Sequence, residues 1–222
     1  MTTDLSSPST GQTAPAPRPS LAPPAAAPNA FLAGNPAAVG LPSFIVGSVA
    51  LALVLVGYVP ASAVGASLPI IAAATGLGLT ISTVWAAATG QSAVASIFGI
   101  FAGFWLSYAV LVLGLTHNWF AITPAAAVHT QGLFLITWLV VIVMLTVATL
   151  RLPLAFTVLF TLIDLALVAV LIGTLNASTG WLKFGGVVVF AFAAVGVYLY
   201  LGIAAIVTGG SALPLGQPLL SD

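Results

Sequence analysis

The stretch FLAGNPAAVGLPSFIVGS, from Phe31 to Ser48, opens the first long apolar segment of the chain. It contains an Asn-Pro pair at residues 35–36, then Gly40, then a second proline, Pro42. Each of these residues interrupts or ends a helix, and an ordinary membrane anchor needs none of them. The stretch therefore predicts a membrane helix with a broken, specifically shaped beginning.

The composition places the rest of the chain in a lipid environment. Of 222 residues, 61% are hydrophobic and only 3% are charged, whereas a soluble domain has about 25% charged residues. Three Lys or Arg and three Asp or Glu give a net charge near zero, which argues against nucleic acid as a partner. The sequence has no cysteine, so neither a disulfide nor a thiolate metal site can form.

Six apolar stretches come close to the length of about 20 residues that a helix needs to span a bilayer. Their Val, Leu and Ile run almost without interruption, unlike the alternating pattern of a membrane β-barrel. We therefore predict an all-α integral membrane protein with six transmembrane helices per protomer. The predicted stretches are Leu41–Tyr58, Val64–Ala86, Ala93–Leu115, Val128–Leu150, Pro153–Leu175 and Gly185–Val207.

Two polar segments flank the membrane domain. Residues 1–34 are rich in Pro, Ala, Ser and Thr and have no apolar period, a composition that predicts a disordered or polyproline-like tail. The six-helix domain is predicted over residues 35–208, and a short C-terminal tail over residues 209–222.

The few cations suggest an orientation. With an even number of spans, both termini lie on one side of the membrane. Arg18 and Arg151 would share that side, and Lys183 would lie opposite. The positive-inside rule then places both termini in the cytoplasm, with the chain in the plasma (inner) membrane.

Three short motifs carry more information than the composition. NPAAVGL, at Asn35–Leu41, is followed by Phe44 three residues on. FAGFWLSYAVL lies at Phe101–Leu111, and LPLG lies at Leu213–Gly216, after the last apolar stretch. In this order, and over about residues 33–217, they resemble the acetate uptake transporter family, the succinate–acetate permeases.

This resemblance implies a six-helix protomer assembled into a homohexameric ring, with a narrow pore in each protomer for small carboxylate anions such as acetate or succinate. It also implies an apolar constriction of three side chains, which fall here on Phe44, Phe101 and Leu162. Ile163 is an alternative to the last of these, because the match in the fifth stretch needs a gap. No cofactor is expected.

The broken start of the first helix is the predicted place where substrate enters. Backbone N–H groups at a helix start favour anions. Asn35 can cap the helix, Pro36 suits its first turn, and Gly40 lets another backbone come close. The alternative is that the Asn-Pro pair simply caps a membrane helix.

Asp164 is the one carboxylate within the six stretches. A charged residue at that depth costs about 2.5–3.5 kcal/mol, so it rarely faces lipid. It is either a protonation-linked site or a neutral acid that forms a hydrogen bond with a neighbouring helix, and the residues favour neither. His117 and His129 flank the longest loop without a carboxylate or cysteine beside them, so we expect plain polar residues and no metal site.

The sequence contains no His/Glu metal spacing, no Gly-x-Ser-x-Gly and no phosphate loop, so we do not expect an enzyme. Two classes of function remain, an anion channel or transporter and a transport-degenerate homologue that serves as a structural subunit of a larger membrane assembly. The second stays open because Phe101 stands where the family usually has Tyr or another polar residue, and the second stretch lacks the family's Gln. The predicted pore is therefore less polar than is usual.

Overall fold

The structure is a computed structural model that describes residues 33–220. Most of the predicted N-terminal tail, with Arg18, lies outside the described residues. Within the described part the secondary structure is entirely helical. Its elements are α1 (Ala37–Val56), the 3-10 helix η2 (Ala61–Ser67), the π-helix η3 (Ile70–Gly76), α2 (Leu77–Ala88), α3 (Ser92–Thr116), α4 (Pro124–Thr149), α5 (Leu154–Leu175) and α6 (Thr179–Val207).

Six helical spans in the described chain are long and apolar enough to cross a membrane. Five of them are the single helices α1, α3, α4, α5 and α6, and the other, Gly65–Ala88, joins the end of η2 to η3 and α2. This result confirms the predicted all-α fold with six membrane helices.

Several helices begin earlier than the apolar stretches predicted. The helix α1 begins at Ala37, α4 at Pro124 and α6 at Thr179. Pro36 directly precedes α1, Pro124 begins α4 and Thr179 begins α6. At such positions a proline's missing N–H costs no helical hydrogen bond. Apolar composition marks the part of a helix in the hydrocarbon, so it misses turns that lie in the interface.

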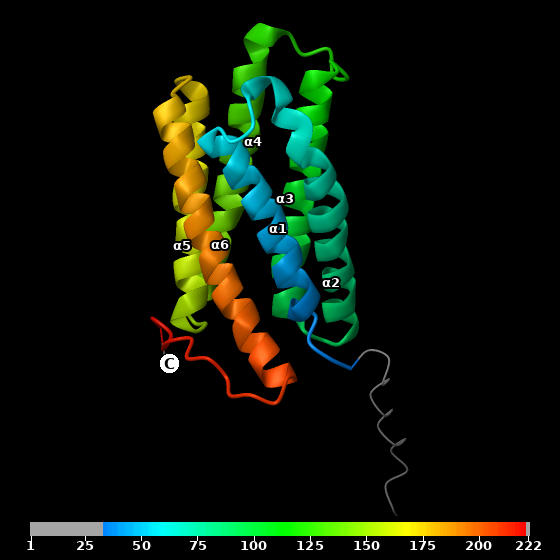
Figure 1. Ribbon diagram of the computed structural model, residues 1–222, viewed down its shortest axis with the longest axis vertical. Helices are drawn as coiled ribbons and strands as arrows, with labels where there is room; N and C mark the ends of the chain where they lie inside the picture. The colour runs from blue at the N-terminus through cyan, green and yellow to red at the C-terminus, as the bar shows by residue number, and fades with distance from the viewer. Residues whose placement is uncertain (1–32, 221–222) are drawn as a thin grey trace, which may run out of the picture.

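The bundle has two groups of helices that meet around a central space (Figure 1). The helix α6 has its largest interfaces with α1 and α5, and α4 packs mainly on α5. On the other side, α2 packs mainly on α3, and both η3 and α2 contact α1. The helices α3 and α4 share only a small direct interface, and aromatic side chains extend between them, with the ring centroids of Phe104 and Trp138 5.5 Å apart.

The start of α1 and the end of α6 lie at the same end of the bundle (Figure 1). Beyond α6, residues 208–220 form no helix and run back across this end toward the start of α5. The backbone N–H of Ala155 donates to the carbonyl of Leu215 at 2.9 Å, and the hydroxyl of Tyr198 donates to the carbonyl of Pro214 at 2.6 Å. The LPLG motif thus ties this C-terminal strap, residues 208–220, to α5 and α6.

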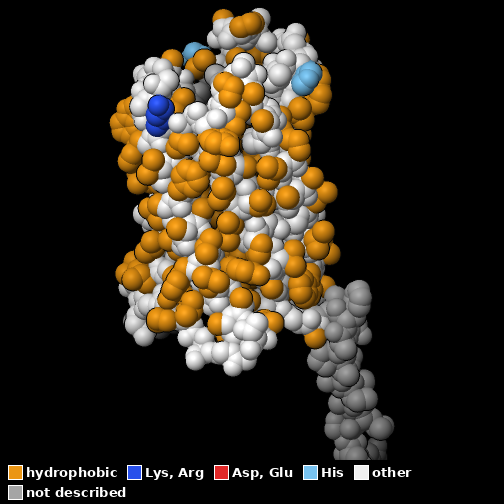
Figure 2. Space-filling view, in the orientation of Figure 1, with side chains coloured by type: hydrophobic (Ala, Val, Ile, Leu, Met, Phe, Trp, Pro, Cys, Tyr) orange, Lys and Arg blue, Asp and Glu red, His pale blue; other side chains and the backbone are white. Residues whose placement is uncertain are grey.

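The outer surface is that of a membrane protein. Large hydrophobic side chains are exposed on all six spans, and Figure 2 shows them covering most of one face. The charged residues in the described chain are Arg151, Asp164 and Lys183. Arg151 lies in the turn between α4 and α5, and Lys183 lies in the second turn of α6, at the opposite end of the bundle.

Candidate functional site

Two cavities, of about 590 Å³ and 330 Å³, lie inside the bundle. Cavity 1, the larger, extends to the end at which α3 finishes and α6 begins. Cavity 2 extends to the opposite end, where α1 begins and the C-terminal strap crosses. Among the described residues, Phe44 and Phe101 line both cavities and no other residue does.

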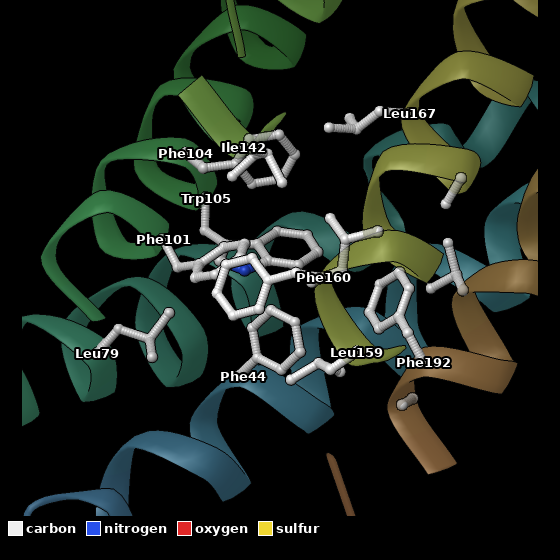
Figure 3. Packing of buried hydrophobic residues seen from close by; sticks show 14 of the residues in the cluster. Phe44, Leu79, Phe101, Phe104, Trp105, Ile142, Leu159, Phe160, Leu167 and Phe192 are labelled. Carbon is white, nitrogen blue, oxygen red and sulfur yellow. The ribbon is translucent and has the colours of Figure 1, made fainter. Parts of the chain in front are cut away.

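Four buried phenylalanines form an aromatic barrier between the cavities. The ring centroids of Phe44 and Phe101 are 4.9 Å apart, with the rings edge to face. Phe160 lies 5.7 Å from Phe101, and Phe192 lies 5.7 Å from Phe44 (Figure 3). None of the four is more than 4% exposed. Packed rings in this geometry attract one another beyond their area of burial, so the barrier is closed in this structure.

One face of α3 follows both cavities from end to end. A helix of 25 residues is about 37 Å long, enough to cross the hydrocarbon. Its cavity-lining residues recur every three or four positions, as one face of a helix requires. They are Val94, Ile97 and Phe98 on cavity 2, Phe101 at the barrier, and Phe104, Trp105, Tyr108, Leu111, Val112, Leu115 and Thr116 on cavity 1.

The structure differs from the prediction at Leu162. This residue is half-buried and lines neither cavity. Its neighbour Ile163, the alternative considered from the sequence, is 5% exposed and lines cavity 1, while Phe160 lines cavity 2. Because each residue of an α-helix turns by about 100°, Phe160 and Ile163 share a face of α5 from which Leu162 points away.

The Asn-Pro pair at the start of α1 does not leave free backbone donors, contrary to the proposed reason for its presence. The side-chain oxygen of Asn35 accepts from the N–H of Ala37 at 3.0 Å. The N–H of Ala38 donates to the carbonyl of Asn35, and those of Val39 and Gly40 donate to the carbonyl of Pro36. Asn35 therefore caps the helix, and its side chain also lines cavity 2.

Pro36 and Gly40 hold this helix start against its neighbours. The buried carbonyl of Pro36 also accepts from the hydroxyl of Ser82 in α2, at 2.7 Å. A Cβ atom at Gly40 would collide with the ring of Phe98, which lines cavity 2. The glycine is therefore required because an aromatic ring, and not another backbone, comes close.

Most of the non-aromatic polar residues that line the cavities lie toward the mouths. The side chains of Lys183, Thr174 and Gln131 line cavity 1 near the ends of their helices. At the other end, Asn35 and Gln91 line cavity 2. Leu213 and Leu215 of the C-terminal strap also line cavity 2, so the strap forms part of its mouth.

Asp164 lies between α4 and α5 and lines neither cavity. One carboxyl oxygen is 2.6 Å from the hydroxyl of Thr146, and the other is buried with no hydrogen-bond partner among the described residues. The Thr146 hydroxyl also lies 3.0 Å from the carbonyl of Ile142. That hydroxyl has one hydrogen, so both contacts are hydrogen bonds only when Asp164 donates a proton of its own.

The histidines lie away from the cavities. The ring of His117 is 3.0 Å from the carbonyl of Leu113 through its Nδ1 atom and stacks near Trp119. Within the described chain, no group of three His, Cys, Asp or Glu residues could hold a metal ion. The described lining of the cavities consists of apolar side chains, aromatic rings, a few neutral polar groups and Lys183.

The cavity-lining aromatics that sequence reasoning missed include Trp105, Phe160 and Phe192. The signal for the first two was present, because Trp105 follows Phe101 by four residues and Phe160 precedes Ile163 by three. In a helix that is apolar on all sides, a spacing of three or four residues identifies the cavity-facing side only when one residue on that side is already known. Phe192 lies on α6, where no motif identified a cavity-facing position.

Together the fold and the cavities describe a multi-pass membrane protein with two internal cavities that share Phe44 and Phe101 in their linings. The sequence model of the GPR1/FUN34/yaaH family matches residues 18–212, and the chain belongs to that family. This finding confirms the family resemblance inferred from the NPAAVGL and FAGFWLSYAVL motifs.

Known proteins are similar to the chain. The Meiotically up-regulated gene 86 protein of Schizosaccharomyces pombe is 31% identical over 155 residues, which make up 66% of this chain and 49% of that protein. The chain thus spans about half the length of this curated relative. The solved structure of the bacterial acetate channel SatP matches with a TM-score of 0.72 at 22% identity, over 83% of this chain and 99% of that one.

Asp164→Asn tests which role the carboxyl group has. Because the group lies between helices and outside both cavities, the variant should fold, and any anion flux that the wild type shows in liposomes should keep its pH dependence. An asparagine can still form a hydrogen bond with Thr146, so the unfolding free energy should fall by no more than about 1 kcal/mol. A flattened pH profile in a folded variant would instead identify Asp164 as a protonation-linked site.

Proposed function

We propose that the protein is a channel or transporter that passes small carboxylate anions such as acetate through a pore in each protomer. The observation that carries the proposal is that two cavities from opposite ends of the bundle meet at Phe44 and Phe101. The pore would run along α3 from cavity 2, across the aromatic barrier, to cavity 1.

Membership of the family and the fold shared with an acetate channel support this function. The match covers 99% of that channel's chain, so nearly all of that chain has a structural counterpart here. The proposal is one of transport through the protomer and not of an enzymatic reaction.

The barrier suits a small anion with an apolar part. Apolar side chains at a narrow point exclude water, so an anion must lose most of its hydration to pass. The edges of phenylalanine rings carry partial positive charge, which favours a carboxylate group. The methyl group of acetate, or the hydrogen of formate, would lie against the apolar wall of the barrier. Succinate has a second carboxylate to dehydrate, so we expect it to pass more slowly than acetate.

The two mouths suit the approach of anions. Lys183, one of two cations in the described chain, lines the mouth of cavity 1 and would raise the local concentration of anions there. The amide of Asn35 lines the mouth of cavity 2. We place this second mouth, together with Arg151 and both termini, on the cytoplasmic side of the plasma membrane, as the positive-inside rule favours.

Truncating Phe44 or Phe101 to alanine tests the proposed pore. Each change removes a ring from the barrier, so acetate and formate flux in liposomes should rise and selectivity for the smaller anion should fall. In a soluble core such a truncation costs about 3–5 kcal/mol. The fold should lose less here, because each ring borders two cavities.

Phe190→Ala is the matched control for these variants. Phe190 lies on α6, half-buried, and lines neither cavity, so its truncation should leave flux unchanged at equal protein content. If both barrier variants fold and neither passes more anion than wild type, the pore proposal fails. The protein would then be better explained as a structural subunit of a membrane assembly.

We also propose that six protomers form a ring. The Gly99 and Gly103 pair does not support it, because Gly99 packs against Thr83 and Gly103 against Trp138 of the same protomer. The support is the resemblance itself, together with apolar exposed faces on α2 and α4 that can contact either lipid or a second protomer.

The oligomer can be measured directly. Protein purified in a mild detergent should have the mass of six protomers by mass photometry, corrected for bound detergent. A monomer in several detergents and also in lipid nanodiscs would contradict the ring.

A further inference from the structure

Trp105 presents a buried polar group that the aromatic barrier does not use. It is 2% exposed, it lines cavity 1, and it lies one turn beyond Phe101 on the same face of α3. Its indole nitrogen has no hydrogen-bond partner among the described residues. An indole N–H is a donor only, and a buried donor without an acceptor is costly enough that most proteins avoid one.

The position of this donor is at the barrier and not at a mouth. Figure 3 shows the Trp105 side chain in the same buried cluster as the labelled rings of Phe101 and Phe160. Aromatic faces are weak acceptors, so the donor keeps most of its capacity. The other polar residues that line cavity 1 lie within two turns of a helix end; they are Thr116, Gln131, Thr174, Thr179 and Lys183. Trp105 and Tyr108 are therefore the polar aromatic residues deep within the cavity.

We propose that the indole N–H of Trp105 is a substrate-binding group that donates a hydrogen bond to a carboxylate oxygen of the anion beside the Phe44–Phe101 contact. This inference rests on the proposed function and adds the residue that recognises the anion. The ligand class is a small monocarboxylate, whose oxygens accept a hydrogen bond while its apolar end lies against the rings.

A neutral donor fits transport better than a cation would. Hydrogen bonds to an ionised group are about twice as strong as neutral ones, so the N–H offsets part of the lost hydration. A buried lysine would hold the anion more tightly and slow its release. Conduction needs binding that is strong enough for the anion to enter the site and weak enough for it to leave.

Trp105→Phe removes the N–H and keeps an aromatic ring. Acetate flux in liposomes should fall by about tenfold, the loss expected for one hydrogen bond to a charged group. Acetamide, a neutral molecule of nearly the same shape, should pass at least as fast as in wild type, because phenylalanine is smaller than tryptophan. The matched control is Trp138→Phe, whose ring packs on Phe104 but lines neither cavity, and it should change neither flux.

A binding measurement keeps the inference separate from transport. In protein labelled with ¹⁵N at tryptophan, the indole signal that disappears in Trp105→Phe should shift on titration with sodium acetate and not with sodium chloride. If the signal shifts but wild type passes no anion, the proposed transport fails and the binding site stands. The inference is overturned if acetate leaves the signal unmoved, if the variant slows acetate and acetamide equally, or if it slows neither.

Discussion

The contact between the rings of Phe44 and Phe101 divides one internal space into two. Without it, cavities of about 590 Å³ and 330 Å³ would join into a path along the whole length of α3. Its two residues come from helices that share little direct interface, so other contacts must fix their separation. These are the contacts made by the first turns of α1.

The Asn-Pro-Ala-Ala-Val-Gly segment has this positioning role. The bond from Ser82 to the carbonyl of Pro36 ties the start of α1 to α2, and the ring of Phe98 in α3 fits against Gly40. One turn further on lies Phe44, whose carbonyl accepts from the hydroxyl of Ser48 at 2.8 Å. In a membrane, each backbone polar group must find a partner within the protein. Here the bond from Ser82 holds α1 against α2, and the close contact of Gly40 with Phe98 holds it against α3. The unusual start of the helix therefore determines where the barrier stands.

The number and type of spans could be predicted from the sequence because a bilayer imposes both length and composition on a helix. Phe44 and Phe101 could be singled out because each follows or begins a motif, and the structure brings their rings into contact; their role as a constriction stays a prediction. The choice between Leu162 and Ile163 could not be predicted, since both are large apolar side chains that can face either lipid or protein. Only the rotation of α5 about its axis, which packing against α4 and α6 sets, decides between them. For the same reason the sequence did not show that Trp105 lines a cavity. The hydrogen-bond partner of Asp164 could not be predicted either, because Thr146 lies on another helix, 18 residues away in the chain.

The most direct test of the barrier uses the absence of cysteine from the chain. Ile97→Cys and Val112→Cys place single thiols on the same face of α3, one in cavity 2 and one in cavity 1. In oriented proteoliposomes, a membrane-impermeant anionic thiol reagent should label Cys at 97 from one side only and Cys at 112 from the other side only. Adding Phe44→Ala and Phe101→Ala should make both positions reactive from both sides. Labelling of both positions from the same side, or one-sided labelling that persists after both rings are removed, would contradict a pore closed by these two residues.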